Sequence, residues 1–248
     1  MNRKSYDNFD RETLSLENCD KEPVHIPGHI QGFATLIATD PKLKTITYCS
    51  DNGEETFGQS LDALLGHSIR TIFDTELLHA LNNTLSLSSV HHQRERVGHY
   101  VNSDQWFDVW AHLHNDIPIV EFERIDKHQQ EDIQSILTVR SLLARLQKIE
   151  QLDETLNDAV IGLQSFSGFD RVLIYQFDKN GDGEVKAEAR SPAMDPLLGL
   201  RFPKWDIPNQ ARDIMRKLPL RVIADVDATP VMLRQADPTQ APLDLTVA

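Results

Sequence analysis

Cysteine is scarce in this chain of 248 residues: Cys19 and Cys49 are its only two cysteines. Two cysteines are too few for a disulfide framework in a chain of this size, so we expect reduced thiols. Long apolar runs are also missing: no stretch approaches the roughly 18 apolar residues of a membrane span, and the polar N-terminus lacks the apolar core of a signal peptide. We therefore expect a cytoplasmic protein with no membrane partner.

Positive charge is the next deficit, because 25 Lys and Arg residues stand against 38 Asp and Glu residues and leave a formal net charge of -13. Phosphate binding needs a concentrated basic face, so no nucleic-acid partner is expected. Enzyme motifs are lacking too: there is no phosphate-cradling glycine loop, no metal-ligand cluster with fitting spacing and no Gly-x-Ser-x-Gly elbow. The chain itself is thus not expected to be an enzyme.

What is present fits a globular protein of two modest domains, with 40% hydrophobic and 25% charged residues. Residues 1–18 are polar with little periodicity, so we expect a flexible arm. Gly66 is expected to end a helix. The elements predicted for the first half are strands over 34–40 and 45–49, helices over 60–65 and 68–85, and strands over 106–113 and 117–124 joined by a turn at Asn115-Asp116.

The second half begins with a helical zone over 129–163. Its two apolar stripes can bury against their own domain or against a second copy of the chain, and the surplus of apolar positions favours a dimeric bundle. Strands are predicted over 171–177 and 184–190. The loop between them, 178–183, begins like a calcium-binding hand, but Ala189 stands where the bidentate glutamate belongs and the flanks are strands, so a hairpin turn is favoured over a metal site.

Two features of the first half of the chain are best explained by packing in the hydrophobic core. Cys49 lies in a strand-like stretch, where a small buried cysteine is common. The aromatic cluster of Trp106, Phe107 and Trp110 can line a ligand pocket or pack in the core, and strand aromatics usually pack in the core. We therefore expect both features to be structural.

Cys19 differs because it lies just ahead of a stretch with two prolines, Pro23 and Pro27. A nucleophilic thiol a few residues before a stiff segment suits a reactive tether better than a core position. On composition alone Cys19 would be an ordinary reduced thiol. Its surroundings favour a covalently held ligand instead.

Several separate segments of the chain share a recognisable order. They are Cys19 with His25-Ile-Pro-Gly28, then Phe169 to Tyr175 and Gly183 to Arg190, then Phe202-Pro-Lys-Trp-Asp-Ile-Pro208 with Gln210-Ala-Arg212, and finally Arg221 to Pro230. In this order and spacing they resemble the N-terminal photosensory part of a bacteriophytochrome. The resemblance runs from Ser15 or close to it to the end of the chain.

The resemblance implies an α+β fold of antiparallel sheets flanked by helices. A PAS domain with the chromophore-attachment segment is expected over 19–127. A GAF chromophore-binding domain is expected over 128–248, incomplete at its C-terminus, so that the family's later histidines have no counterpart. In the family, the N-terminal segment passes through a lasso of the GAF domain in a figure-of-eight knot, and Ile30 matches the threaded residue.

The resemblance also implies a red/far-red photoreceptor that binds the tetrapyrrole biliverdin IXα. Cys19 matches the thioether attachment to ring A. Asp206, followed by Ile207 in the Asp-Ile-Pro motif, matches a residue whose backbone carbonyl meets the pyrrole nitrogens and whose side chain contacts the tongue of a PHY domain. Arg221 matches an arginine that grips a propionate, a role that suits the planar guanidinium.

Tyr175 and Phe202 match aromatics around ring D, whose rotation is the family's primary photochemical event. Met215 stands where a ring-D tyrosine is usual. Two further departures are Lys204-Trp205 in place of small residues and Gly32-Phe33-Ala34 in place of Pro-His-Gly. These departures lead us to expect an altered photoconversion.

Taken singly, the same positions have ordinary interpretations. Asp206 can be a helix N-cap and Arg221 a surface residue. Tyr175 and Phe202 can be plain core. The surrounding motifs favour the chromophore roles.

The resemblance finally implies partners. A homodimer through the GAF helices is expected, together with C-terminal PHY and output domains in the parent protein, such as a histidine kinase or a diguanylate cyclase. The alternative is a light-blind PAS-GAF module that dimerises and relays signals without a pigment. Bound pigment distinguishes the two hypotheses.

Overall fold

The computed structural model describes residues 23–91, 94–125, 133–218 and 220–247. They divide into two compact units, the first within Met1–His128 and Asn209–Ala248 and the second within Gln129–Pro208. Cys19 and the predicted arm over 1–18 lie outside the described residues. The predicted GAF domain over 128–248 has residues in both units, and the predicted domain boundaries stay predictions.

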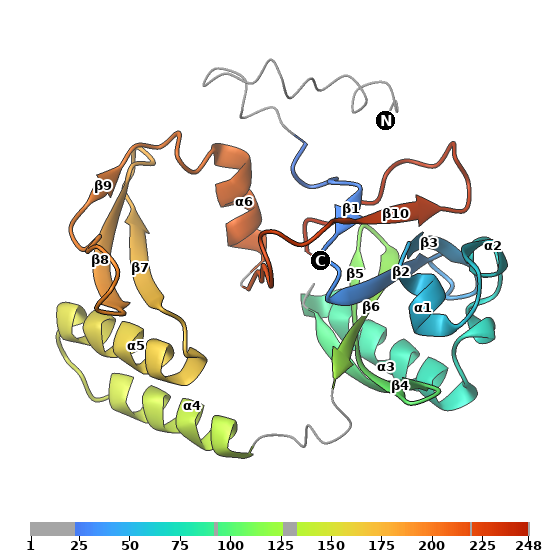
Figure 1. Ribbon diagram of the computed structural model, residues 1–248, viewed down its shortest axis with the longest axis horizontal. Helices are drawn as coiled ribbons and strands as arrows, with labels where there is room; N and C mark the ends of the chain where they lie inside the picture. The colour runs from blue at the N-terminus through green and yellow to red at the C-terminus, as the bar shows by residue number, and fades with distance from the viewer. Residues whose placement is uncertain (1–22, 92–93, 126–132, 219, 248) are drawn as a thin grey trace. The chain divides into compact units, whose positions relative to one another are not determined.

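The first unit is built on one antiparallel sheet. Its strands are β1 (His29–Ile30), β2 (Ala34–Thr39), β3 (Ile46–Ser50), β4 (Glu95–Asn102), β5 (Gln105–His114), β6 (Ile117–Ile125) and β10 (Val231–Gln235). The strand order is β1-β10-β3-β2-β6-β5-β4. Figure 1 shows β10, from late in the chain, beside β1 and β3 from its start. The helices are α1 (Gly53–Phe57), α2 (Leu61–Leu64), the 3-10 helix η4 (Ile69–Thr71), α3 (Thr75–His91) and α6 (Asn209–Lys217).

An apolar core with an aromatic centre fills the space between this sheet and the helices α1, α2, η4 and α3. Phe57 of α1 meets Phe122 of β6 edge to face, with ring centroids 4.9 Å apart, and Phe73 stacks on the same Phe122 ring at 5.7 Å. Cys49 of β3 is completely buried in this core, and burial raises the pKa of its thiol to about 12. The structural role predicted for Cys49 is confirmed.

The hairpin predicted at Asn115-Asp116 is confirmed, because β5 and β6 pair around it and both turn residues have left-handed φ angles of 50° and 62°. In the aromatic cluster of β5, Phe107 is core, with 4% of its surface exposed. Trp106 and Trp110 are only half-buried, and the guanidinium of Arg94 lies 4.8 Å from the centre of the Trp110 ring. The core interpretation therefore holds for Phe107 and does not extend to the two tryptophans.

The single helix predicted over 68–85 is wrong, because a break separates η4 from α3. At the first start, the hydroxyl of Ser68 accepts a hydrogen bond from the N–H of Arg70 at 3.3 Å. At the second start, the carboxylate of Asp74 accepts one from the N–H of Leu77 at 2.8 Å. Each polar side chain caps its own helix, so one apolar pattern gives two helices.

The second unit places a helical pair against a small antiparallel sheet. Its elements are α4 (Ile133–Leu146), α5 (Leu152–Ser167), β7 (Arg171–Phe177), β8 (Gly183–Arg190) and β9 (Arg201–Phe202), and the strand order is β7-β8-β9. Val160 of α5 packs on Ala187 and Ala189 of β8. Gly162 lets α4 and α5 approach closely, because a Cβ there would overlap Leu142. The helices and the two longer strands predicted for this half are confirmed.

Apolar side chains remain exposed on both helices of the second unit. Leu137 and Leu143 of α4 are 51% and 53% exposed, and Leu152 and Ile161 of α5 are 68% and 56% exposed. Within the part of the chain that the structure describes, no helix has both the length and the apolar character needed to cross a membrane.

Candidate functional site

The stretch that follows the predicted tether, residues 23–31, is called the N-terminal segment below. The carbonyl of His25 accepts a hydrogen bond from the N–H of Leu245 at 2.7 Å, and the carbonyl of Gly28 accepts one from the N–H of Leu233 at 3.0 Å. Next in the chain, β1 pairs with β10. The N-terminal segment is thus held along its length by a late part of the chain.

A third bond ties this segment to the region after Arg221. The side-chain oxygen of Gln31 accepts a hydrogen bond from the N–H of Ala224 at 2.7 Å. Ile30, the residue matched to the threaded position, lies in β1 and packs on the apolar cluster around Leu243. The two segments that the predicted knot would join therefore lie side by side, and the threading itself stays a prediction.

Two of the predicted ring-D residues lie together in the second unit. Tyr175 of β7 and Phe202 of β9 are half-buried, and their ring centroids are 6.0 Å apart with a tilt of 45°. Phe177 adds an edge-to-face contact to Tyr175 at 5.1 Å. The small sheet thus presents a continuous aromatic surface.

Gly183, which the sequence analysis did not select, makes this surface possible. It lies opposite Phe177 in β7 and opposite Phe202 in β9. A Cβ at Gly183 would overlap the ring of Tyr175, so only glycine leaves space for that ring in its present position. A glycine within a strand signals such a close approach, but the sequence predicts a loop over 178–183, so Gly183 is recognised as a strand glycine only from β8.

The Asp-Ile-Pro motif follows β9 through a turn. The N–H of Asp206 donates to the carbonyl of Pro203 at 3.0 Å, and the N–H of Lys204 donates to the carboxylate of Asp182 at 2.9 Å. Asp206 is exposed and Ile207 is half-buried. Because α6 starts only at Asn209, Asp206 does not cap that helix, and the N-cap interpretation is wrong.

Met215 and Arg221 belong to the first unit. Met215 lies on α6 and is 55% exposed, whereas Arg212 and Ile214 of the same helix are buried. Arg221 is exposed after the end of α6. Tyr175, Phe202, Asp206 and Ile207 belong to the second unit, so the residues predicted for the site are divided between the two units.

The loop with the calcium-like pattern is a hairpin turn, as predicted. The carboxylate of Asp178 accepts hydrogen bonds from the N–H groups of Asn180 at 2.8 Å and Asp182 at 3.1 Å. Its second oxygen lies 3.4 Å from the guanidinium of Arg201 in β9. This carboxylate closes the turn and fastens it to β9, which the Asp206 turn follows in the chain.

Comparison with known proteins adds to this geometry. A family model described as a PAS fold matches residues 19–125. The chromophore-binding domain of the wild-type phytochrome P1 of Stigmatella aurantiaca is 32% identical, with a TM-score of 0.82 over 93% of this chain and 77% of that structure. The cyanobacterial phytochrome B of a Nostoc species is 30% identical over 88% of this chain, and the bacteriophytochrome of Xanthomonas campestris is 31% identical over 94%.

The structure combines helices with antiparallel sheets and has a PAS fold in the first unit. In this it matches the chromophore-binding domains of phytochromes. The chain belongs to the bacteriophytochrome family. It spans 29% of the length of the Nostoc protein and 37% of the length of the Xanthomonas protein.

Proposed function

We propose that this chain is the light-sensing part of a red/far-red photoreceptor that binds biliverdin IXα through a thioether to Cys19. One observation carries the proposal: the N-terminal segment that follows Cys19 is hydrogen-bonded to the chain beyond Arg221. In the sequence, the predicted tether shortly precedes one of these bonded segments, and the predicted propionate partner Arg221 shortly precedes Ala224 in the other. Family membership supports the sensory role, and the solved structures that the chain resembles are chromophore-binding domains.

A bilin consists of flat, largely apolar rings, which require an aromatic packing surface. Tyr175 and Phe202 supply such a surface, and because both are half-buried, part of each ring remains accessible. Gly183 keeps the Tyr175 ring in place. We assign the two aromatics to ring D and Gly183 to their positioning.

A cationic tetrapyrrole with two propionates also needs charged partners. Asp206 and Arg221 are exposed, and no hydrogen bond or ion pair engages either side chain among the described residues. A carboxylate near the pyrrole nitrogens favours the protonated chromophore. The guanidinium fork of Arg221 suits a propionate. Ile207 and Met215 supply apolar lining, and Met215 offers no hydroxyl to ring D.

Signal output is proposed for the longer parent protein, through PHY and output domains, because the relatives are about three times as long as this chain. The chain itself senses and is not the catalyst. We propose a cytoplasmic homodimer through α4 and α5, because a second copy would bury their exposed leucines. Without a pigment, the same surfaces would serve a light-blind relay module, so pigment binding decides between the two.

The test is expression with a biliverdin source, followed by a denaturing gel stained with zinc. A fluorescent band is expected for the parent chain, and Cys19→Ser should abolish it. Cys49→Ala is the matched control, because the buried Cys49 thiol, with its pKa raised to about 12, is not expected to attach a bilin.

A fluorescent band that survives in Cys19→Ser would refute Cys19 as the tether. A dark parent lane calls for the same gel on a chain extended to the length of the relatives' chromophore-binding domain. If that longer chain is dark as well, the light-blind relay module replaces the photoreceptor.

A further inference from the structure

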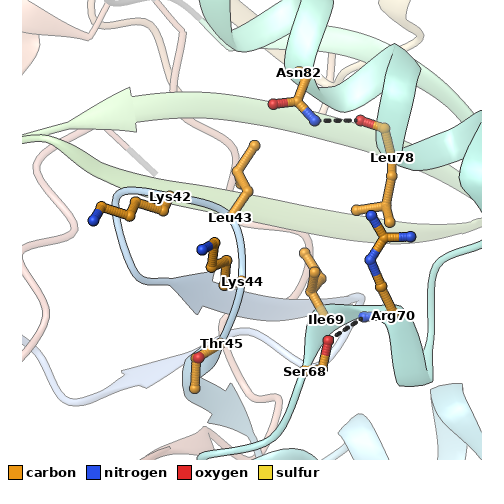
Figure 2. Close-up of a pocket in the computed structure, with 9 residues that line it drawn as sticks. All are labelled: Lys42, Leu43, Lys44, Thr45, Ser68, Ile69, Arg70, Leu78 and Asn82. Carbon is orange, nitrogen blue, oxygen red and sulfur yellow. Dashed lines mark hydrogen bonds between the residues drawn. The ribbon is translucent and has the colours of Figure 1, made fainter.

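A cavity of about 470 Å³ opens on the first unit between the β2–β3 loop, η4 and the start of α3. None of the residues assigned to the chromophore lines it. Its floor is apolar and consists of Leu43, Ile69 and Leu78, the last two being 1% and 7% exposed. Figure 2 shows Lys44 and Arg70 on opposite sides of Ile69 in this view.

Three cations are among the residues that line this cavity. Lys42, Lys44 and Arg70 are all exposed, and the described residues offer none of them an ion-pair partner. The chain as a whole is acidic, with a formal net charge of -13. A bound anion would meet three positive charges that no carboxylate of the described residues neutralises.

The loop that carries the two lysines has a fixed shape. The carboxylate of Asp40 accepts hydrogen bonds from the N–H groups of Lys44 at 2.7 Å and Thr45 at 3.4 Å. The N–H of Leu43 donates to the carbonyl of Asp40 at 3.0 Å, and Leu43 has a left-handed φ of 52°. Asp40 is thus engaged with the backbone of the loop, which it folds into a tight turn.

Backbone bonds also fix this loop to η4. The N–H of Ile69 donates to the carbonyl of Lys44 at 2.9 Å, and Thr45 forms a β-bridge with Ser68. The hydroxyl of Ser68 accepts from the N–H of Arg70. The backbones that carry Lys44 and Arg70 therefore have set positions, which lowers the entropic cost of binding one ligand between them.

From this arrangement we infer a second ligand site, for a small organic anion that carries one carboxylate or phosphate group on an apolar body. The anionic group is held by Lys42, Lys44 and Arg70, because charge-assisted hydrogen bonds from cations to such groups are strong. The apolar body packs on Leu43, Ile69 and Leu78. The cavity volume lies within the usual range of about 300–1,000 Å³ for small-molecule sites.

The test is to titrate the chain with each of four probes and to monitor the backbone amide signals by NMR. The probes are hexanoate, hexyl phosphate, 1-hexanol and inorganic phosphate. Saturable shifts centred on Thr45 and residues 68–71 are expected for the two amphiphilic anions. Binding of 1-hexanol and of inorganic phosphate should be weaker by about tenfold or more. The tighter of the two anions identifies the head group. Equal binding of 1-hexanol, or shifts that do not saturate, would overturn the inference.

Charge-removing variants separate this site from general electrostatics. Lys44→Gln with Arg70→Gln should weaken hexanoate binding by about tenfold. Lys179→Gln with Arg140→Gln removes the same charge from exposed positions of the second unit and should leave binding unchanged. Equal weakening by both pairs would overturn the inference. If the first pair lowers the thermal midpoint, Lys44→Gln alone takes its place in the same comparison.

Discussion

The ring of Tyr175 lies over Gly183, in the position that the first side-chain carbon of any other residue at 183 would occupy. The ring also contacts Phe202 across β8. A residue without a side chain therefore determines where the aromatic surface of the second unit lies. This relationship can be tested without any pigment.

Gly183→Ala should force the Tyr175 ring away from β8 or spread the strands. Overpacking of this kind costs about 1–3 kcal/mol, and urea unfolding of the second unit would measure it. Gly32→Ala is the control, because a Cβ there meets only Val231 at an ordinary 3.5 Å. Equal losses of stability in the two variants would contradict the close approach.

The buried carboxylate of Glu188 leads to a second prediction. One oxygen accepts hydrogen bonds from the N–H groups of Leu197 and Leu198 at 2.9 and 3.0 Å, and the other lies 3.1 Å from Nε of Arg171. Glu188→Ala leaves the half-buried guanidinium of Arg171 and two loop N–H groups without this acceptor. We expect a loss of about 1–3 kcal/mol in urea unfolding, because the polar groups that the buried carboxylate satisfied are left without a partner.

Glu184→Gln is the matched control for Glu188→Ala. Glu184 lies in the same strand, and the side chain is solvent-accessible where it pairs with Lys186. A surface pair of this kind contributes little to stability. If the Glu184 variant lost as much stability as the Glu188 variant, burial would not be the cause.

The sequence predicts those parts of the fold that depend on neighbours in the chain. The turn at Asn115-Asp116 is an example, because both residue types tolerate the left-handed backbone that the hairpin needs. The sequence also contains a signal for the break before α3, because Asp74, three residues before Leu77, is a residue type that caps helices. It was missed because the apolar spacing continues across it.

The pairing of β1 with β10 was not predictable from pattern. A strand of two residues, His29–Ile30, has no periodicity to detect, and its partner lies near the other end of the chain. Within the candidate site, Tyr175 and Phe202 were selected through motif resemblance, and their ring centroids lie 6.0 Å apart in the structure. Gly183 was not selected, because the sequence places it in the loop over 178–183 and only the structure places it in β8. The roles of these residues toward a pigment stay predictions.

His112 leads to a prediction on pH. The residue is completely buried, and Nδ1 lies 3.5 Å from Oε1 of Glu121. Burial, followed by the charges of His114 and Arg94, lowers the pKa of His112 to about 3. Because the unfolded value is about 6.5, the unfolded chain binds this proton more readily. The contribution of His112 is therefore constant above about pH 6.5, and stability is lost as the pH falls from there towards 3.

Urea unfolding between pH 4 and pH 7.5 would measure this loss. His112→Leu should remove a slope of up to about 1.4 kcal/mol per pH unit. Burial raises the pKa of Glu121, whose contribution has the opposite sign, so the difference between parent and variant isolates His112. His79→Leu on the exposed side of α3 should leave the slope in place. An unchanged slope in His112→Leu would exclude His112 as its source.

The last prediction concerns Gly28. Its carbonyl accepts a hydrogen bond from the N–H of Leu233, and its φ of 74° lies in the left-handed region. Gly28→Ala adds a Cβ that meets nothing within 4 Å, so the only penalty is backbone strain of about 1 kcal/mol. That strain loosens the N-terminal segment on which the proposed tether Cys19 depends. We expect slower covalent attachment of biliverdin. Zinc fluorescence at successive times after the pigment is added would measure the rate.

Gly168→Ala is the control for this prediction, because Gly168 ends α5 with a φ of 71° and also has nothing within 4 Å of an added Cβ. The two variants carry the same strain, so thermal unfolding should show similar losses of stability. Attachment should slow only in Gly28→Ala, because of the two glycines only Gly28 lies in the N-terminal segment, where its carbonyl accepts a hydrogen bond from the N–H of Leu233 in β10. If attachment slowed equally in both, reduced stability would account for the effect. If it slowed in neither, the bonds between the N-terminal segment and β10 would not be what presents Cys19 to the pigment.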